Sequence, residues 1–241
     1  MAWTDITRPL YCRKDLRYAS DSTDAEWLII APFLEARSRV GRPRCHSMRV
    51  IWDAIQYIAR AGCQWRMLPK EFPPLSTVQY HFYKLRDSGL LDIINEALVG
   101  VARLLDGRNA EPTAGIIDSQ SVKTTESGGA SGYDAGKKVK GRKRHILVDT
   151  QGHMLFGMVH PANIQDRDGA IDVLEATCQS FPNLRHVFAD GGYAGPKLAT
   201  ALACIQANIT LEVVKRNDTD KGFVVIARRW VVERTFAWLG R

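Results

Sequence analysis

The sequence predicts an α/β protein in which a small all-helical domain, residues 1–109, precedes a mixed sheet flanked by helices, residues 110–241. The first observation behind this prediction is a change near residue 110, where the helical repeat of apolar residues gives way to short apolar runs typical of strands. The second is the order of elements after that point, in which strands alternate with helices. A chain of 241 residues is long enough for one or two domains with a sizeable core.

The first half of the chain is predicted to be helical throughout. Thr23 with Glu26, and Ser76 with Gln79, have the spacing of a capping box, in which two side chains three residues apart cap one helix start. Three of the predicted helices stop at a glycine, the residue that most readily ends a helix. The predicted helices cover residues 22–35, 47–62, 76–89 and 90–107.

The third of these helices is a candidate for DNA contact. Gln79, His81, Lys84 and Arg86 carry side chains that could reach a groove or the backbone phosphates. The alternative is that this half of the chain is only a helical packing module, and the residues leave both interpretations open.

The second half is predicted to form a mixed sheet covered by helices. An apolar run closes with Asp118, a hairpin follows around a turn at residues 149–152, and a later apolar strand ends at Asp190 before two glycines. The histidines are dispersed along the chain, and His145, His153 and His160 are expected in or beside strands and not on a metal. The predicted order is strand 114–118, hairpin 144–162, helix 166–181, strand 184–190, helix 195–206, strand 209–216 and helix 228–241.

Three carboxylates in this half are candidates for a metal site. Asp118 and Asp190 each follow a buried-type strand, at the edge where sites assemble in open α/β sheets. Such a carboxylate is costly to bury unless it is paired or binds a cation, and oxygen ligands suit hard divalent cations. Glu233 lies on the last predicted helix with Arg229 one turn earlier, so a plain i,i+4 ion pair is the alternative. The apolar stripe of that helix consists of Val231, Val232, Thr235, Phe236, Trp238 and Leu239.

The composition indicates a basic protein. Its 33 Lys and Arg against 26 Asp and Glu give a net charge of +7, which favours a polyanionic partner such as nucleic acid. The five cysteines contain no CxxC pair and predict reduced thiols. No signal-peptide core or membrane-length apolar run occurs, so no membrane partner is expected. The expected location is the cytoplasm, in association with the nucleoid.

Five segments, in this order, carry a resemblance to a known family: IIDSQSVKT, GYDAGKKVKGRKRHILVDT, VHPANIQDRDGA, FADGGYAG and RRWVVERTFAWLGR. The chain resembles bacterial insertion-sequence transposases of the DDE type, in the group named after insertion sequence five. The resemblance extends upstream through GCQWRMLPKEFPP and so covers nearly the whole chain.

The resemblance implies a ribonuclease-H-like catalytic domain with Asp118, Asp190 and Glu233 as its catalytic triad and metal ligands. It implies two Mg²⁺ ions, with Mn²⁺ able to substitute and Asp118 bridging both. The ions would activate water to hydrolyse one phosphodiester and then activate the freed 3′-hydroxyl to attack target DNA. The implied partner is double-stranded DNA, both element ends and target, with the helical domain binding the ends and a homo-oligomer assembling on the DNA.

A dense basic segment lies between Asp118 and the next predicted strand and follows a glycine-rich stretch. It is too dense in charge to be expected in a core, and its predicted role is phosphate binding beside the site, where it would position DNA without reading sequence. The alternative is a solvated charge run. The residues concerned are Lys137, Lys138, Lys140, Arg142, Lys143 and Arg144.

The chain also departs from the patterns of its relatives. In the Y-(2)-R-(3)-E-(6)-K signature of neighbouring groups, Arg229 stands at the arginine position and is a candidate DNA contact, but Ile226 and Gly240 replace the tyrosine and lysine. Relatives continue past WLGR, so a C-terminally truncated chain that cleaves poorly is expected. A metal-dependent nuclease that does not join DNA, and a catalytically inactive DNA-binding remnant or repressor, are the alternative functions.

Overall fold

The computed structural model describes residues 12–35, 44–124, 128–205, 209–214 and 229–240. The chain divides into two compact units, residues 1–97 and 98–241, and the division falls inside helix α5 (Leu90–Leu105). Within the described ranges, no helix is long and apolar enough to cross a membrane.

The first unit is helical, as predicted, and contains α2 (Asp24–Leu34), α3 (Met48–Ala61), the short η1 (Trp65–Met67) and α4 (Leu75–Asp87). The capping box of Thr23 and Glu26 is confirmed at the start of α2. The second predicted box is wrong: α4 begins directly after Pro74, so Ser76 already lies inside the helix, and no side chain caps it. Buried residues of α3 and α4, Ile51, Trp52, Ile55 and Val78 among them, contribute to the core of this unit.

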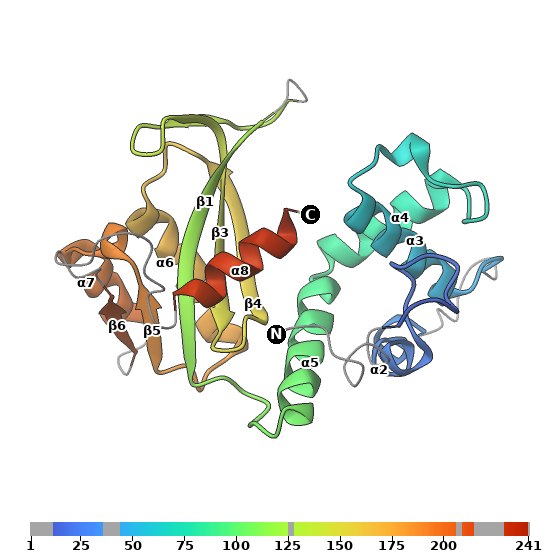
Figure 1. Ribbon diagram of the computed structural model, residues 1–241, viewed down its shortest axis with the longest axis horizontal. Coiled ribbons are helices and arrows are strands. Elements are labelled where there is room, and N and C mark those ends of the chain that lie inside the picture. The colour runs from blue at the N-terminus through green and yellow to red at the C-terminus, as the bar shows by residue number, and fades with distance from the viewer. Residues whose placement is uncertain (1–11, 36–43, 125–127, 206–208, 215–228, 241) are drawn as a thin grey trace. The chain divides into compact units, whose positions relative to one another are not determined.

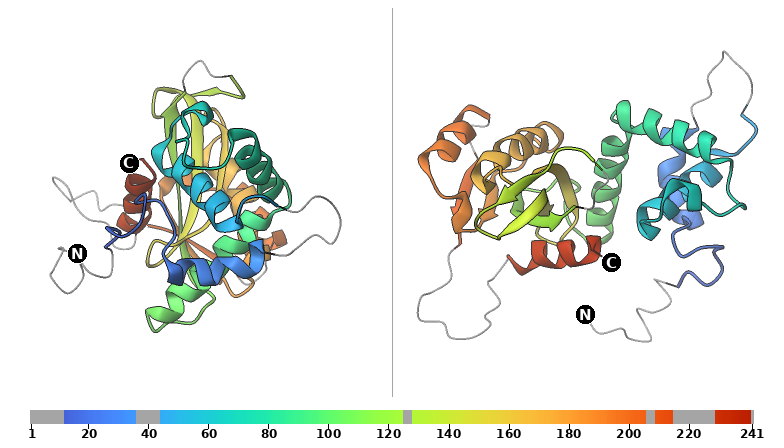
Figure 2. Two further views of the ribbon diagram at one scale, coloured as in Figure 1. Left: turned by 90° about the vertical axis from the view of Figure 1, so that its right-hand side faces the viewer. Right: turned by 90° about the horizontal axis from the view of Figure 1, so that it is seen from above.

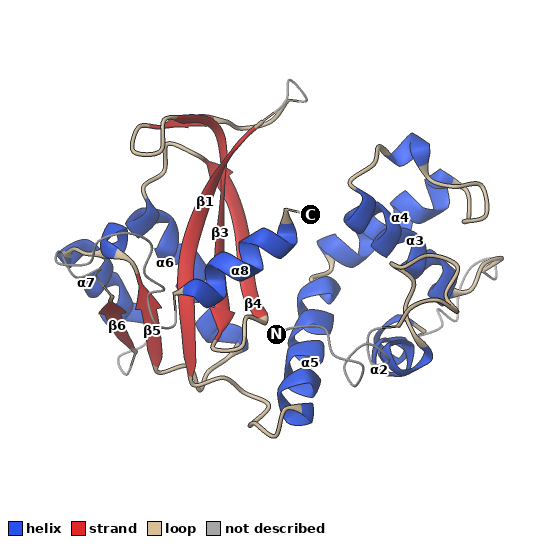
Figure 3. Cartoon of the chain, in the orientation of Figure 1, coloured by secondary structure: helices blue, strands red, loops and turns tan. Residues whose placement is uncertain are grey.

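The second unit contains a sheet of six strands in the described residues (Figures 1 and 3). The strands β4, β3 and β1 pair antiparallel, and β5 and then β6 continue the sheet parallel to β1. This order and direction are those of a ribonuclease-H-like fold, so the predicted fold class is confirmed. The strands are β1 (Ala114–Lys123), β2 (Gly132–Asp134), β3 (Val139–Asp149), β4 (Met154–Pro161), β5 (His186–Ala189) and β6 (Thr210–Val213).

Helices cover both faces of the sheet (Figure 2). On one face, α6 (Asp166–Ser180) and α7 (Pro196–Ile205) enclose a core with Ile117 of β1 and Leu147 of β3. On the other face, α8 (Trp230–Leu239) packs against Ile116, Ile146, Val148 and Phe188. Because successive strand residues point to opposite faces, β1, β3 and β5 contribute alternate residues to the two cores.

Candidate active site

Strand alternation places Asp118 and Asp190 on the face that α8 covers. Asp118 lies two residues after Ile116, and Asp190 lies two residues after Phe188, so each aspartate points to the same face as that apolar residue. Ile116 and Phe188 both belong to the core that α8 covers. The parallel register pairs Ile116 with Phe188, so two residues further on it aligns Asp118 with Asp190. Neighbouring strands lie about 4.8 Å apart, which brings the two carboxylates into one neighbourhood.

Asp118 does not end its strand, which corrects the sequence prediction. After Asp118, β1 continues to Lys123, and residues 119–123 pair with residues 141–145 of β3. The apolar run stops at Asp118 because the rest of the strand is only half-buried, not because the strand stops. Asp190 does follow its strand directly, as predicted, and opens the short η2 turn (Gly191–Tyr193).

The surroundings of Asp118 oppose its negative charge. Burial and the nearby charge of Asp190 raise the pKa of Asp118 to about 6, although the backbone N–H of Ser119 donates to its carboxylate at 2.7 Å. The positive charges of Lys137 and Arg229 act in the opposite direction and lower this pKa. Because the charge of Asp190 opposes that of Asp118, a cation between the two carboxylates would relieve their repulsion.

Arg229 lies between Asp190 and Glu233. Its Nη2 is 3.7 Å from Asp190 Oδ2 and 3.9 Å from Glu233 Oε1. The guanidinium is largely buried, whereas the Glu233 side chain is 54% exposed. The i,i+4 ion pair is therefore present, and the same arginine also links Glu233 to the aspartates. Over the described residues, no three His, Cys, Asp or Glu side chains form a group that could hold a metal ion.

α8 is held on the sheet by both apolar and polar contacts. Val231, Val232 and Phe236 are buried, and the Thr235 hydroxyl donates to the Gly152 carbonyl oxygen at 3.0 Å. The predicted apolar stripe is wrong at its end, because Trp238 is 55% exposed and Leu239 is 46% exposed. The Arg234 guanidinium lies over both Trp230 and Trp238, 4.7 Å from each ring centre, so these rings pack on a side chain and not on the sheet.

Most of the basic segment lies in β3, and part of it is exposed to solvent. It leads from β2 through a turn into β3, and two of its arginines are held within the unit: Arg142 bonds to the carbonyls of Gly128 and Ala130, and Arg144 to Gln120 and Leu239. Lys138 and Lys140 are exposed and make no ion pair with any other described residue.

Lys143 contradicts the expectation that the segment stays out of the core. Its side chain is 4% exposed, and Nζ lies 2.6 Å from Asp166 Oδ1, 2.7 Å from the Ile164 carbonyl and 3.4 Å from Asp134 Oδ2. It points to the α6 face because it lies an even number of residues from Leu147, which belongs to the core on that face. A phosphate contact by Lys143 does not fit this position.

Lys137, in the turn before β3, lies near the carboxylates of both Asp118 and Asp166. Its Nζ donates to the Ser119 carbonyl at 2.9 Å and to Ser119 Oγ at 3.1 Å, and it lies 3.8 Å from Asp166. Sequence reasoning missed the roles of Ser119 and Asp166, which bond to each other at 2.7 Å. The only available signal was an acidic residue in the first turn of a helix, which is common for reasons of helix dipole alone.

The candidate DNA-contacting residues of α4 lie in the first unit. Lys84 and Arg86 are exposed, and Gln79 is half-buried. Arg86 bonds to Asp87 and lies 4.8 Å from the ring centre of Tyr83. His81 is half-buried, and burial lowers its pKa.

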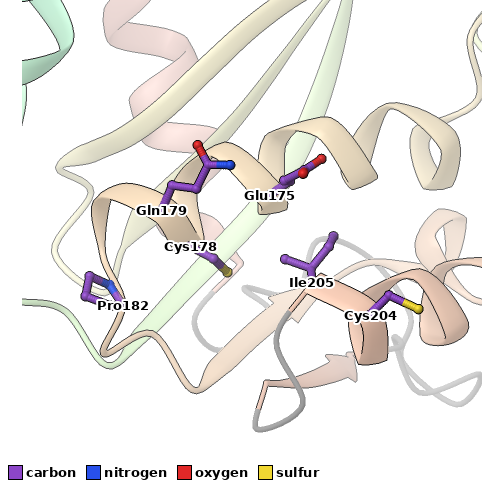
Figure 4. Close-up of a pocket in the computed structure, with 6 residues that line it drawn as sticks. All are labelled: Glu175, Cys178, Gln179, Pro182, Cys204 and Ile205. Carbon is purple, nitrogen blue, oxygen red and sulfur yellow. The ribbon is translucent and has the colours of Figure 1, made fainter.

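A shallow pocket elsewhere in the second unit has no part in this constellation. It lies near the C-terminal ends of α6 and α7, whereas Asp166 lies at the start of α6 (Figure 4). Burial raises the pKa of the Cys178 thiol, which makes that sulfur a weak nucleophile. The lining residues are Glu175, Cys178, Gln179, Pro182, Cys204 and Ile205.

Together, the fold and the site define a ribonuclease-H-like domain with an acidic site beside its parallel strands. Comparison with known proteins gives the family. Residues 109–241 match the family described as "Transposase DDE domain", and residues 23–95 match one described as "Putative transposase of IS4/5 family". The chain belongs to the DDE transposase family. Membership in this family implies dependence on divalent metal ions in general.

Individual proteins agree with the family assignment. The chain is 33% identical over 106 residues to a Burkholderia cepacia protein described as "Putative transposase for insertion sequence element IS402". That match covers 41% of this chain and 49% of the relative, so the chain spans about half the length of the curated relative that it matches.

Two solved structures are similar over 73% of this chain: "Mos1 transposase paired-end complex with left transposon end" and "Crystal structure of a pre-cleavage Mos1 transpososome". The similarity covers 60% and 61% of those chains, with identities of 11% and 9% and TM-scores of 0.27 and 0.25.

Proposed function

We propose that this protein binds the ends of an insertion sequence and catalyses metal-dependent cleavage and strand transfer of DNA. The observation that carries the proposal is the closeness of Asp118, in β1, to Asp190, which directly follows the parallel strand β5, with Arg229 linking Asp190 to Glu233 of α8. Each of the three carboxylates comes from a different element, so the site depends on the completed fold.

Asp118, Asp190 and Glu233 are the proposed metal ligands. Their donors are all carboxylate oxygens, the chemistry that Mg²⁺ prefers, with Mn²⁺ able to substitute. The raised pKa of Asp118 beside Asp190 supports this assignment, because a cation there would stabilise both charges. When bound, two such ions would neutralise the phosphate and acidify the attacking water or 3′-hydroxyl.

Arg229 and Lys137 are the proposed contacts to the reacting phosphate. Both are cations beside Asp118, and Lys137 is fixed by two bonds to Ser119. Arg229 is shared between Asp190 and Glu233, so its movement toward a phosphate would free both carboxylates for a metal. These two residues would hold and orient the DNA strand at the site.

The remaining DNA contacts are proposed on two surfaces. In the second unit, the exposed Lys138 and Lys140 would contact phosphates, whereas Arg142 and Arg144 would do so only by leaving their present partners. In the first unit, Lys84 and Arg86 of α4 are exposed, and Gln79 of the same helix is half-buried. A homo-oligomer assembled on DNA, in the cytoplasm at the nucleoid, is the proposed working form.

An assay with labelled insertion-sequence end DNA tests the proposal and separates it from its alternatives. Strand transfer predicts a joined product when Mg²⁺ or Mn²⁺ is present. A nuclease that does not join gives only the cleaved product, and an inactive remnant or repressor gives only a shifted band. The end DNA is best taken from the sequence flanking the gene, because inverted repeats there would identify the substrate.

A further inference from the structure

A chain of buried hydrogen bonds runs behind the candidate active site, on the α6 face of the sheet. The Tyr193 hydroxyl lies 2.7 Å from His145 Nε2, His145 Nδ1 lies 3.4 Å from His160 Nε2, and His160 Nδ1 lies 3.1 Å from the Pro161 carbonyl oxygen. Tyr193 and His145 are fully buried, and His160 is 9% exposed. The Tyr193 ring also belongs to the apolar core on this face, whereas the two histidines are polar residues within it.

The Pro161 carbonyl determines the direction of this chain. A carbonyl oxygen can only accept, so His160 Nδ1 carries the proton and His160 Nε2 accepts from His145 Nδ1. His145 Nε2 is then an acceptor, and Tyr193 must donate to it. Burial, together with the neighbouring His160, lowers the pKa of His145 to about 3, so the ring is neutral at physiological pH.

Helix α6 closes over the two histidines through Gly169. A Cβ added at Gly169 would lie 2.6 Å from His160 Nε2 and 2.9 Å from His145 Nδ1, distances that side-chain carbons do not adopt. The helix backbone therefore approaches the hydrogen bond between the two rings as closely as a residue without a side chain allows. This close packing gives the imidazoles little freedom to turn.

Tyr193 connects this chain to Asp190. The two residues are joined by the η2 turn, in which the Tyr193 N–H donates to the Asp190 carbonyl and the Gly192 N–H donates to Asp190 Oδ1 at 2.8 Å. Burial, and then the charges of Asp118, Asp166 and Asp190, raise the pKa of Tyr193, so its hydroxyl stays protonated as the donor that His145 requires. In addition, His145 pairs with Ser119, the residue after Asp118, across β3 and β1.

We propose that Tyr193, His145 and His160 are positioning residues that fix the Asp190 turn relative to Asp118. The inference rests on the proposed function, in which these two aspartates bind a divalent cation. Asp190 stands at the end of a four-residue strand and its side chain is 31% exposed, so the turn needs an anchor. The bond from Tyr193 to His145 in β3 is that anchor, and the contact between His145 and His160 keeps the acceptor in place.

Tyr193→Phe tests the anchor, because it removes the hydroxyl and keeps the buried ring. The affinity for Mn²⁺ of the full chain, measured by calorimetry, is expected to fall about tenfold, as for other residues that orient metal ligands. The rate of end cleavage should fall with it, whereas DNA affinity without metal should stay within about twofold. His145→Leu should reproduce both losses, and His145→Gln, which keeps an acceptor, should restore part of the Mn²⁺ affinity. A purely structural role would instead lower the melting temperature without this rescue.

A second variant tests the same hydrogen bonds without changing Tyr193. Gly169→Ala changes neither histidine nor Tyr193, yet its methyl group would separate the two rings. Gly169→Ala should lower the affinity for Mn²⁺, as Tyr193→Phe does. In the intact protein, ¹⁵N spectra of the imidazoles should show the Nδ1–H tautomer for both His145 and His160. An Nε2–H tautomer for either ring would overturn the proposed direction.

The outcomes separate this inference from the proposed function. If the unaltered protein binds Mn²⁺ and Asp118→Asn abolishes the binding, the metal site exists. Unchanged Mn²⁺ affinity in Tyr193→Phe, His145→Leu and Gly169→Ala would then overturn the positioning role alone. If the unaltered protein binds no Mn²⁺ at all, the proposed function fails together with the inference.

Discussion

At the residue scale, Asp118 is a carboxylate whose folded environment favours its protonated form. The pKa of about 6 lies above that of an aspartate in an unfolded chain, about 3.9, so the folded state binds this proton more tightly. The stability of the metal-free protein therefore declines as the pH rises from about 4 to about 6, and the full cost is present above that range. A rise of this size corresponds to at most about 3 kcal/mol.

Asp118→Asn should therefore stabilise the metal-free protein while abolishing cleavage. At pH 7.5 the free energy of unfolding is expected to increase by up to about 3 kcal/mol, and near pH 3.5 the difference should vanish because both states are protonated. Denaturant titrations at the two pH values measure this effect. Asp172→Asn, at an exposed position on α6, is the matched control and should change neither quantity. An equally active Asp118→Asn protein would exclude Asp118 from the site.

Asp149 is not a suitable control for Asp118, although the sequence suggests it. Its position in a hairpin turn predicts a replaceable residue whose Asn variant stays active. The turn is confirmed, but the Asp149 side chain is fully buried, pairs with Arg103 and accepts from the backbone of Gln151 and His153. A hydrogen bond with the His153 side chain, together with these bonds, outweighs the effect of burial and lowers the pKa of Asp149 to about 2, so its replacement is expected to destabilise the fold.

Lys143 and Lys140 make a second matched pair at this scale. Lys143→Met would leave Asp166 and Asp134 without their buried cation, and breaking such a pair costs about 3 kcal/mol or more. Lys140→Met removes an exposed charge and should change the free energy of unfolding by less than about 0.5 kcal/mol. Equal melting temperatures for the two variants would show that Lys143 is not buried as described.

At the element scale, the order of strands and helices follows from the sequence, but the extent of the polar strands does not. Apolar runs identify β5 and the apolar end of β3, because those residues face both cores. Residues 119–123 of β1 instead pair with the basic part of β3, and β2 pairs with it as well. Lysines and arginines in a strand hide the period-two pattern, since only a tertiary partner such as Asp166 makes their burial favourable.

The docking of α8 through Thr235 provides the prediction for this scale. Thr235→Val removes a buried hydrogen bond to the β3–β4 turn, which should lower the free energy of unfolding by about 1 kcal/mol and loosen the helix that carries Glu233. Thr177→Val in α6 is the control, because Thr177 bonds only to the Val173 carbonyl of its own helix. Both variants should lose similar stability, but only Thr235→Val should also lose cleavage rate. Equal rates would show that Glu233 does not depend on this contact.

At the scale of the whole molecule, net charge predicts a polyanionic partner without locating the contacts. The charge of +7 is a property of composition, whereas the availability of each cation is set by tertiary structure. Of the six cations in the basic segment, Lys143 is buried and Arg142 and Arg144 have protein partners. The triad could be named from resemblance, but the position of Arg229 between two of its members could not, because it depends on how α8 docks.

The salt dependence of DNA binding tests this division among the cations. Each phosphate contact adds roughly one to the slope of log affinity against log salt concentration. Replacing Lys138 and Lys140 by alanine should therefore lower the slope by about two for DNA of any sequence, because both side chains are exposed and unpaired within the described part of the second unit. Replacing Arg142 and Arg144 should change the slope by less than about one, since their guanidinium groups already bond to the protein. Fluorescence anisotropy with labelled duplexes at several salt concentrations measures both slopes. If the arginine pair lowers the slope as much as the lysine pair, those arginines leave their partners on binding and contact the DNA backbone together with Lys138 and Lys140.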